Sequence, residues 1–161
     1  MSRITIFLII LLFLNACSGK EKKEKQKSDA MAIETTSQYG YNLDFLRKHV
    51  QVIELKNGRS AIALVPAWQG RVMTSTAGGD QGFSFGWINH NLISAGVIQP
   101  HINAFGGEER LWLGPEGGQF SIYFKKGDPF VFEKWQTPAF IDTTPFEVLS
   151  QTDSSALFAL D

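Results

Sequence analysis

The sequence predicts a mainly β protein whose strands form an antiparallel sandwich. The chain has 161 residues, of which 43% are hydrophobic, and this is enough for one globular domain with a substantial core. Thirteen Phe, four Trp and fifteen Gly accompany short apolar runs, a composition typical of strands and turns. No segment with helical periodicity exceeds about ten residues. We therefore expect residues 41–161 to form the sandwich domain.

The clearest local pattern consists of two β-rich runs, 50–56 and 59–65, on either side of Asn57-Gly58. This dipeptide favours a type I′ turn because both of its positions accept a positive φ. The sequence therefore predicts a β-hairpin here. Before it, Asn42 is expected to cap a short helix over 43–49.

Further strands are expected along the rest of the chain. In 83–88, the aromatic residues Phe83, Phe85 and Trp87 share one face of an extended segment. The stretch that follows, 89–103, is expected to be irregular with a helical turn. The other predicted strands are 70–76, 119–124, 129–135 and a final hairpin of 146–152 and 155–161.

The first residues carry a targeting signal. Arg3 precedes an apolar run, 4–14, which matches the apolar part of a signal peptide and is short for a membrane span. The sequence Leu-Asn-Ala-Cys that ends at Cys17 resembles the lipobox of bacterial lipoproteins. Residues 1–16 are then the signal peptide, and a lipid on Cys17, the only cysteine, would anchor the chain. The alternative is a signal anchor with a chance cysteine.

Residues 17–40 are expected to be a disordered tether. The stretch 19–30, "GKEKKEKQKSDA", is rich in Lys and Glu and holds no large apolar residue that could be buried. A polybasic contact with lipid is the alternative. Ser18 follows the cysteine, where an Asp retains lipoproteins in the inner membrane of well-studied Gram-negative systems. The expected location is the bacterial cell envelope, with the outer membrane favoured over the inner.

Charge and motifs exclude several functions. The net charge of −1 gives no reason to expect a nucleic-acid partner. In the glycine-rich stretch 103–121, "NAFGGEERLWLGPEGGQFS", Glu108 and Glu109 follow Gly-Gly and would repel a phosphate. No Gly-x-Ser-x-Gly motif indicates a nucleophilic serine. No short spacing of His, Cys or carboxylates supports a metal site, so we expect neither a metal nor another cofactor.

Two chemistries remain for this stretch. Carboxylate acid–base catalysis would use its glutamates, with their pKa values set by burial and neighbours. Carbohydrate recognition would use an aromatic ring against the apolar face of a sugar, and polar side chains around its hydroxyl groups. The residue types favour carbohydrate recognition, and the expected ligand-binding residues are Asn103, Glu108, Arg110, Trp112 and Glu116.

Each of these residues also has a structural interpretation. Trp112 lies between two leucines and is more often a core residue than a sugar platform, and Trp68, Trp87 and Trp135 are expected in the core. Glu108 and Arg110 could form an ordinary surface ion pair, worth under about 1 kcal/mol.

The stretches "VPAWQGRVMTSTAGG" and "FGGEERLWLGPEGG" resemble galactose mutarotase-like proteins, the aldose 1-epimerase superfamily. The resemblance covers about residues 48–161 and is closest to an uncharacterised group of secreted or lipoprotein members. Its strongest element is Gly-Gly, Leu-Trp and Pro-Glu, carried here by Gly106, Gly107, Leu111, Trp112, Pro115 and Glu116. It implies a large antiparallel β-supersandwich with a sugar-binding concave face, of which this chain would hold the N-terminal part.

The resemblance also implies a chemistry. In mutarotases, a histidine protonates the ring oxygen, while a glutamate far toward the C-terminus takes the proton of the anomeric hydroxyl. His101, or His90 in its place, would be the acid, and the base would lie beyond Asp161. Phe105 stands where the usual His-Gly-Gly element has its histidine, which favours binding over catalysis.

The expected function is therefore that of an envelope lipoprotein that binds or processes carbohydrate, by epimerisation if it is an enzyme. Its expected partners are a carbohydrate ligand and, through the lipidated N-terminus, a membrane. The alternatives are a non-catalytic envelope interaction module and an accessory domain of a polysaccharide-degrading system.

Overall fold

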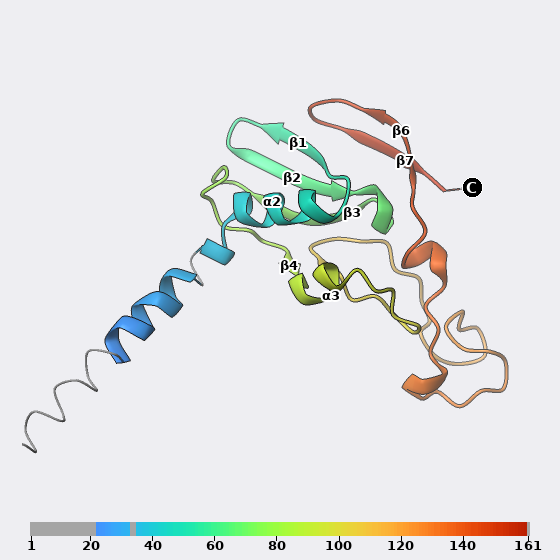
Figure 1. Cartoon of the computed structure of the whole chain (residues 1–161). Coiled ribbons are helices and arrows are strands. Elements are labelled where there is room, and N and C mark those ends of the chain that lie inside the picture. Colours follow the sequence, from blue (N-terminus) through green and yellow to red (C-terminus); the bar gives the residue numbers. More distant parts are fainter. Residues whose placement is uncertain (1–21, 33–34, 161) are drawn as a thin grey trace, which may run out of the picture. The chain divides into compact units, whose positions relative to one another are not determined.

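A computed structural model describes residues 22–32 and 35–160 (Figure 1). The chain divides into two units, residues 1–36 and residues 37–161. In the first unit, residues 22–32 are helical and all their side chains are exposed, which differs from the irregular tether that we expected. Lys, Glu and Gln have high helix propensity, and this favours a helix without a buried face. The signal peptide and Cys17 lie outside the described residues.

A three-stranded antiparallel sheet is the centre of the second unit. Its strands β1 (Ile53–Asn57), β2 (Ser60–Val65) and β3 (Arg71–Thr76) lie in the order β1-β2-β3 (Figure 1). A short 3-10 turn, η1 (Pro66–Trp68), connects β2 to β3. The three strands predicted in this part of the chain are confirmed, with ends that differ by a few residues.

The turn between β1 and β2 differs from the prediction. Asn57 pairs with Ser60, so the two residues of the loop are Gly58 and Arg59, and of these only Gly58 has a positive φ, 61°. The predicted type I′ turn at Asn57-Gly58 is therefore wrong. A glycine at the first loop position is the requirement of a type II′ turn, which also joins antiparallel strands with the correct twist.

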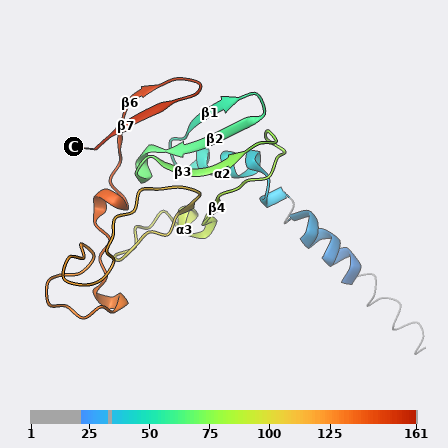
Figure 2. The ribbon, with the colours of Figure 1, turned by 180° about the vertical axis from the view of Figure 1, so that it is seen from behind.

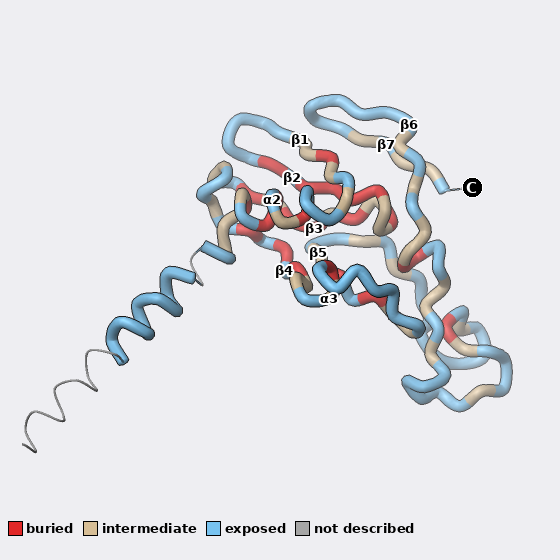
Figure 3. Tube along the Cα trace, in the orientation of Figure 1, coloured by how far each residue is buried: buried red, intermediate tan, exposed pale blue. Residues whose placement is uncertain are grey.

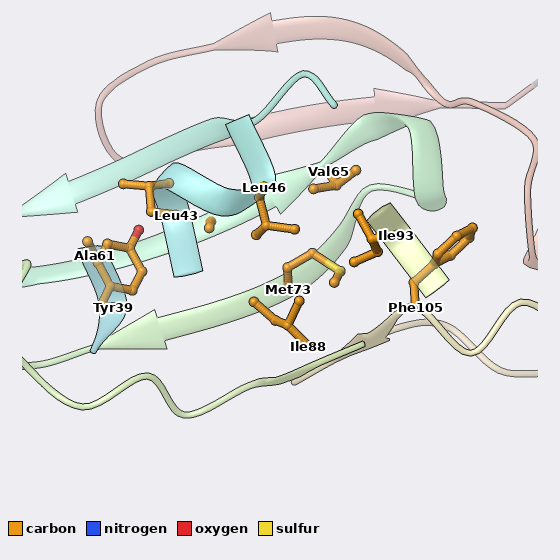
Figure 4. Packing of buried hydrophobic residues seen from close by; sticks show 10 residues of the cluster. Tyr39, Leu43, Leu46, Ala61, Val65, Met73, Ile88, Ile93 and Phe105 are labelled. Carbon is orange, nitrogen blue, oxygen red and sulfur yellow. The ribbon is translucent and has the colours of Figure 1, made fainter. Parts of the chain in front are cut away.

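Helix α2 (Tyr39–His49) covers one face of this sheet. Its Leu46 lies next to Val65 and Met73 of the strands, and Leu43 lies nearer Ala61 (Figure 4). These side chains belong to one cluster, the main core. The burial pattern shows the same concentration of buried residues along β2, β3 and the facing side of α2 (Figure 3). The core therefore lies between one helix and one sheet.

Asn42 does not cap this helix. The helix begins after Gln38, and Asn42 lies within its first two turns, almost fully buried. Its Nδ2 donates to the Oγ of Ser84 at 2.9 Å, and that hydroxyl lies 2.6 Å from Oγ1 of Thr74 on β3. The asparagine thus connects the helix to the next part of the chain through buried hydrogen bonds.

A second, two-stranded sheet lies at the free edge of β3. It consists of β4 (Trp87–Ile88) and β5 (Gly106–Gly107), and α3 (His90–Ala95) follows β4. The strand predicted at 83–88 is reduced to β4, although Phe85 N–H still donates to Ser75 O on β3 at 3.1 Å. Ile88, Ile93 and Phe105 from this part join the main core (Figure 4).

Residues 108–145 are mostly irregular. The strands predicted at 119–124 and 129–135 are wrong, and this part contains two 3-10 turns, η2 (Phe132–Lys134) and η3 (Ala139–Ile141). Four of the aromatic side chains that suggested strands, Tyr123, Phe124, Phe130 and Trp135, contact one another instead through their rings. A strand needs a neighbouring edge for its backbone hydrogen bonds, and these residues have none among the described strands.

The predicted final hairpin is confirmed as β6 (Glu147–Gln151) and β7 (Ala156–Ala159). It lies beside β1 in both views of the ribbon (Figures 1 and 2). Two backbone hydrogen bonds hold it there: Lys56 N–H donates to Asp153 O, and Phe146 N–H donates to Pro66 O, each at 2.9 Å. The described domain is therefore mainly β, with small antiparallel sheets and few helices. No helix in the described ranges is long and apolar enough to cross a membrane.

The central core predicts the effect of a truncation in α2. Leu46 has no exposed surface, so Leu46→Ala should lower the free energy of unfolding by about 2–5 kcal/mol. The change can be measured by chemical denaturation of the full chain. Leu149→Ala is the matched control because Leu149 on β6 is 53% exposed, and its effect should stay within about 0.5 kcal/mol. Equal losses in the two variants would contradict this location of the core.

Candidate functional site

The Gly106-Gly107 strand approaches its neighbours more closely than any residue with a side chain could. A Cβ on Gly106 would lie 2.2 Å from Trp87 O, and a Cβ on Gly107 would lie 2.7 Å from Cδ of Arg71. Both residues also have a positive φ, 93° and 119°. Glycine is therefore required at both positions, which explains the Gly-Gly that begins the unusual stretch.

Arg71 is the buried group against which this strand lies. It is 2% exposed, and its Nη1 donates to Gly106 O at 2.7 Å. Its Nε and Nη2 are buried and have no hydrogen-bond partner among the described residues. Burial, with a smaller contribution from the positive charge of Arg110, lowers the pKa of Arg71 to about 10. The guanidinium is still charged at neutral pH. A cation with two unpaired nitrogen donors, Nε and Nη2, therefore lies next to β5.

A pocket of about 280 Å³ lies next to this arginine. We call it the Trp87 pocket, and it is lined by Arg71, Trp87, Ile102, Ala104, Gly106, Gly107 and Arg110. Trp87 is 63% exposed, which contradicts its expected place in the core. The pocket therefore combines an open indole ring with two guanidinium groups.

Phe83 and Phe85 continue the exposed aromatic surface of Trp87. The predicted alternation is confirmed: these three aromatic residues are exposed, while the residues between them, Ser84 and Gly86, are buried. The small residues face inward because both hydrogen-bond to Thr74 Oγ1 on β3. Ser84 does so through its Oγ, and Gly86 donates its backbone N–H. We call the three exposed rings the aromatic row.

Arg110, Trp112 and Glu116, three of the expected ligand-binding residues, lie together. The guanidinium carbon of Arg110 lies 4.0 Å from the centre of the Trp112 ring, and Trp112 Nε1 donates to Glu116 Oε1 at 2.8 Å. Trp112 also stacks on Tyr123, which stacks on Trp135. Trp112 is thus engaged by protein groups and positions Arg110, while Trp87 is the more open ring. Burial lowers the pKa of Arg110, with the charge of Asp142 opposing that shift.

Asn103 and Glu108 have different surroundings. Asn103 is 1% exposed, and both its backbone N–H and its Nδ2 donate to the buried carboxylate of Asp142, at 3.0 and 2.8 Å. It therefore positions the chain before β5 and offers no surface to a ligand. Glu108 is exposed and accepts a hydrogen bond from Ser75 Oγ at 2.9 Å. Within the described part of the chain it forms no ion pair with Arg110.

The two candidate histidines lie in different environments. The Nδ1 of His101 lies 2.6 Å from Trp135 O and 3.1 Å from Nε2 of Gln136, so the described hydrogen bonds of this ring use Nδ1 and leave Nε2. His101 packs on Phe132 and is not among the residues that line the Trp87 pocket. His90, at the start of α3, lies against Phe45 with a ring distance of 4.2 Å. Its Nε2 is buried without a partner in the described structure.

Sequence reasoning missed Arg71 and Asp142. A charged residue at the start of a strand is usually exposed, and nothing near Arg71 in the sequence suggests that it is buried. Asp142 lies 39 positions from Asn103, so only the fold brings the two together. The described residues contain no group of three or more His, Cys, Asp or Glu that could hold a metal ion.

These observations define a mainly β protein with an aromatic row, a small pocket and two convergent arginines. Residues 37–161 match the family of unknown function DUF6786, and the chain belongs to that family. The match begins where the second structural unit begins, four residues before the predicted start of the domain. No curated protein and no solved structure matches the chain significantly.

The environment of His90 predicts a dependence of stability on pH. Burial lowers the pKa of His90 in the folded state below its ordinary value of about 6.5. The unfolded chain then binds more protons than the folded chain below this pH. The free energy of unfolding should therefore have its full value above about pH 6.5 and decrease as the pH falls.

Chemical denaturation at pH 7.5 and at pH 5.5 measures this contribution. His90→Phe should lose less stability between the two pH values than the unsubstituted protein. His49→Phe is the control, because His49 is exposed on α2, and it should behave like the unsubstituted protein. An unchanged pH dependence in His90→Phe would show that His90 does not cause the effect.

Proposed function

We propose that this protein is an envelope-anchored lipoprotein whose domain binds carbohydrate at the aromatic row and the Trp87 pocket. One observation carries the proposal: an indole ring that is 63% exposed lies beside a pocket lined by two arginines. An exposed aromatic ring packs on the apolar face of a sugar, and guanidinium N–H groups donate to its oxygens. Pockets that combine apolar rings with a few convergent polar groups are the usual form of small-molecule sites.

The spacing of the aromatic row supports a ligand longer than one sugar. Phe83 and Phe85 precede a bend at Gly86, and Trp87 begins β4 after it, so the row presents three exposed rings at alternate positions of the chain. Phe83 and Phe85 contact each other edge to face, with a ring distance of 5.4 Å. An oligosaccharide that lies along this row would contact more than one ring and end at the Trp87 pocket.

The proposal includes a galactose mutarotase-like sandwich as the fold. Its support is the resemblance of the stretch from Gly106 to Glu116, together with the antiparallel pairing of every described sheet. It also includes a lipid on Cys17 and a place in the outer membrane, which rest on the lipobox-like sequence and on Ser18.

Sugar epimerisation is a second candidate function, in which His101 would be the acid. It is favoured by the hydrogen bond between His101 Nδ1 and Trp135 O, because this bond fixes the ring and leaves Nε2 to exchange a proton. Interconversion of the two anomers of a bound sugar, followed by NMR, separates an epimerase from a non-catalytic binding module or an accessory domain of a polysaccharide-degrading system.

Removal of the exposed indole tests the binding function. Calorimetry of the full chain against a panel of neutral and acidic oligosaccharides should identify a ligand, and Trp87→Ala should weaken it about tenfold, or ~1.4 kcal/mol. Phe120→Ala is the control, since Phe120 is an exposed aromatic residue outside the row. Absence of binding across the panel, or an equal loss in both variants, would refute the proposed site.

The lipid anchor has a separate test. In a bacterial host, the unsubstituted protein should incorporate labelled fatty acid and sediment with membranes. Cys17→Ser should lose the label, because no sulfur would remain to carry the lipid. Membrane attachment of the unsubstituted protein without label would instead indicate an uncleaved signal anchor.

A further inference from the structure

We infer that the Trp87 pocket binds the carboxylate of an acidic sugar, a uronic acid unit, between the guanidinium groups of Arg71 and Arg110. This inference rests on the proposed carbohydrate-binding function and specifies the class of ligand. The first argument is charge. Both arginines line the pocket, and no Asp or Glu does.

The carboxylate whose charge acts on both arginines, that of Asp142, already accepts hydrogen bonds within the protein. Asp142 acts on both Arg71 and Arg110, but it forms no ion pair with either of them in the described structure. Its oxygens accept the backbone N–H and the Nδ2 of Asn103. Two cations therefore line the pocket without a carboxylate among the lining residues, and the local charge is positive.

The second argument is the unused hydrogen-bonding capacity of Arg71. Of its donors, Nη1 is used by Gly106 O, while Nε and Nη2 are buried without a partner among the described residues. Buried donors are normally paired, so the guanidinium of Arg71, a residue that lines the pocket, retains hydrogen-bonding capacity for an acceptor. A ligand oxygen that reaches this guanidinium would supply that acceptor.

The third argument identifies a carboxylate attached to a sugar. A planar carboxylate matches the fork of a guanidinium and accepts two parallel N–H groups. Glu108 and Glu109 follow the pocket residues in the chain and disfavour a doubly charged phosphate more than a singly charged carboxylate. The exposed ring of Trp87 at the same pocket would pack on the sugar that carries the charge.

The experiment compares matched sugars on the full chain. Galacturonate and glucuronate oligosaccharides are titrated at low salt beside their neutral counterparts, galactose and glucose oligosaccharides of the same length. We expect at least tenfold tighter binding of one acidic ligand than of its neutral counterpart, and a loss of this preference as salt increases. Inorganic phosphate at equal concentration should not displace the acidic ligand.

Two variants assign the effect to the pocket. Arg110→Gln should weaken binding of the acidic ligand at least tenfold more than it weakens binding of the neutral counterpart. Arg47→Gln is the control, because Arg47 on α2 pairs with Glu54, does not line the Trp87 pocket, and should change the binding of neither ligand. Arg71→Lys, checked for cooperative unfolding, should also lose the acidic preference, since an ammonium cannot donate two parallel N–H groups to a planar carboxylate.

The outcomes separate the two proposals. Binding of neutral and acidic sugars with equal affinity, or an equal loss of both in Arg110→Gln, would overturn the acidic-sugar inference and leave carbohydrate binding intact. Displacement of the ligand by phosphate would overturn the assignment to a carboxylate. Absence of binding to any sugar would overturn the proposed function, and with it this inference.

Discussion

The burial of the Arg71 guanidinium is the interaction on which the candidate site depends. Its hydrogen bond to Gly106 O fixes the Gly-Gly strand, and Gly107 leaves the room that its side chain needs. Next to it, Val72 donates to Glu109 O and accepts from Glu108 N–H. These contacts fix residues 106–109 along β3, and this placement brings Trp87 and Arg110 to one pocket.

The irregular part of the chain after residue 110 is stabilised by contacts between aromatic side chains rather than by the backbone hydrogen bonds of a sheet. Trp112, Tyr123 and Trp135 stack with nearly parallel rings, and Phe124 meets Trp135 edge to face. Apolar residues that alternate along a sequence can pack in such a ring cluster as well as on the face of a sheet. The sequence pattern does not distinguish the two, because the choice depends on whether a strand edge is available. This is why the strands at 119–124 and 129–135 were predicted wrongly.

Local turn chemistry made the two hairpins predictable, at β1–β2 and at β6–β7, because adjacent strands need only a short loop between them. The site was predictable only where its residues lie close in sequence, as for Arg110, Trp112 and Glu116. The orientation of the 83–88 segment was not predictable, since Thr74 binds Ser84 from a different strand. For the same reason, the buried pairing of Asn103 with Asp142 could not be recognised in advance.

The partly unpaired guanidinium of Arg71 raises the question of why a buried arginine is present at this position. A buried donor without a partner costs about 1–3 kcal/mol, so a core selected only for stability would place an apolar side chain at this position. A ligand oxygen that accepts from Nε or Nη2 would recover that free energy, and it would do so only in the bound state. A ligand without such an oxygen would leave the donors unpaired, and the same cost would then count against it. Buried donors of this kind therefore contribute more to discrimination between ligands than to the stability of the free protein.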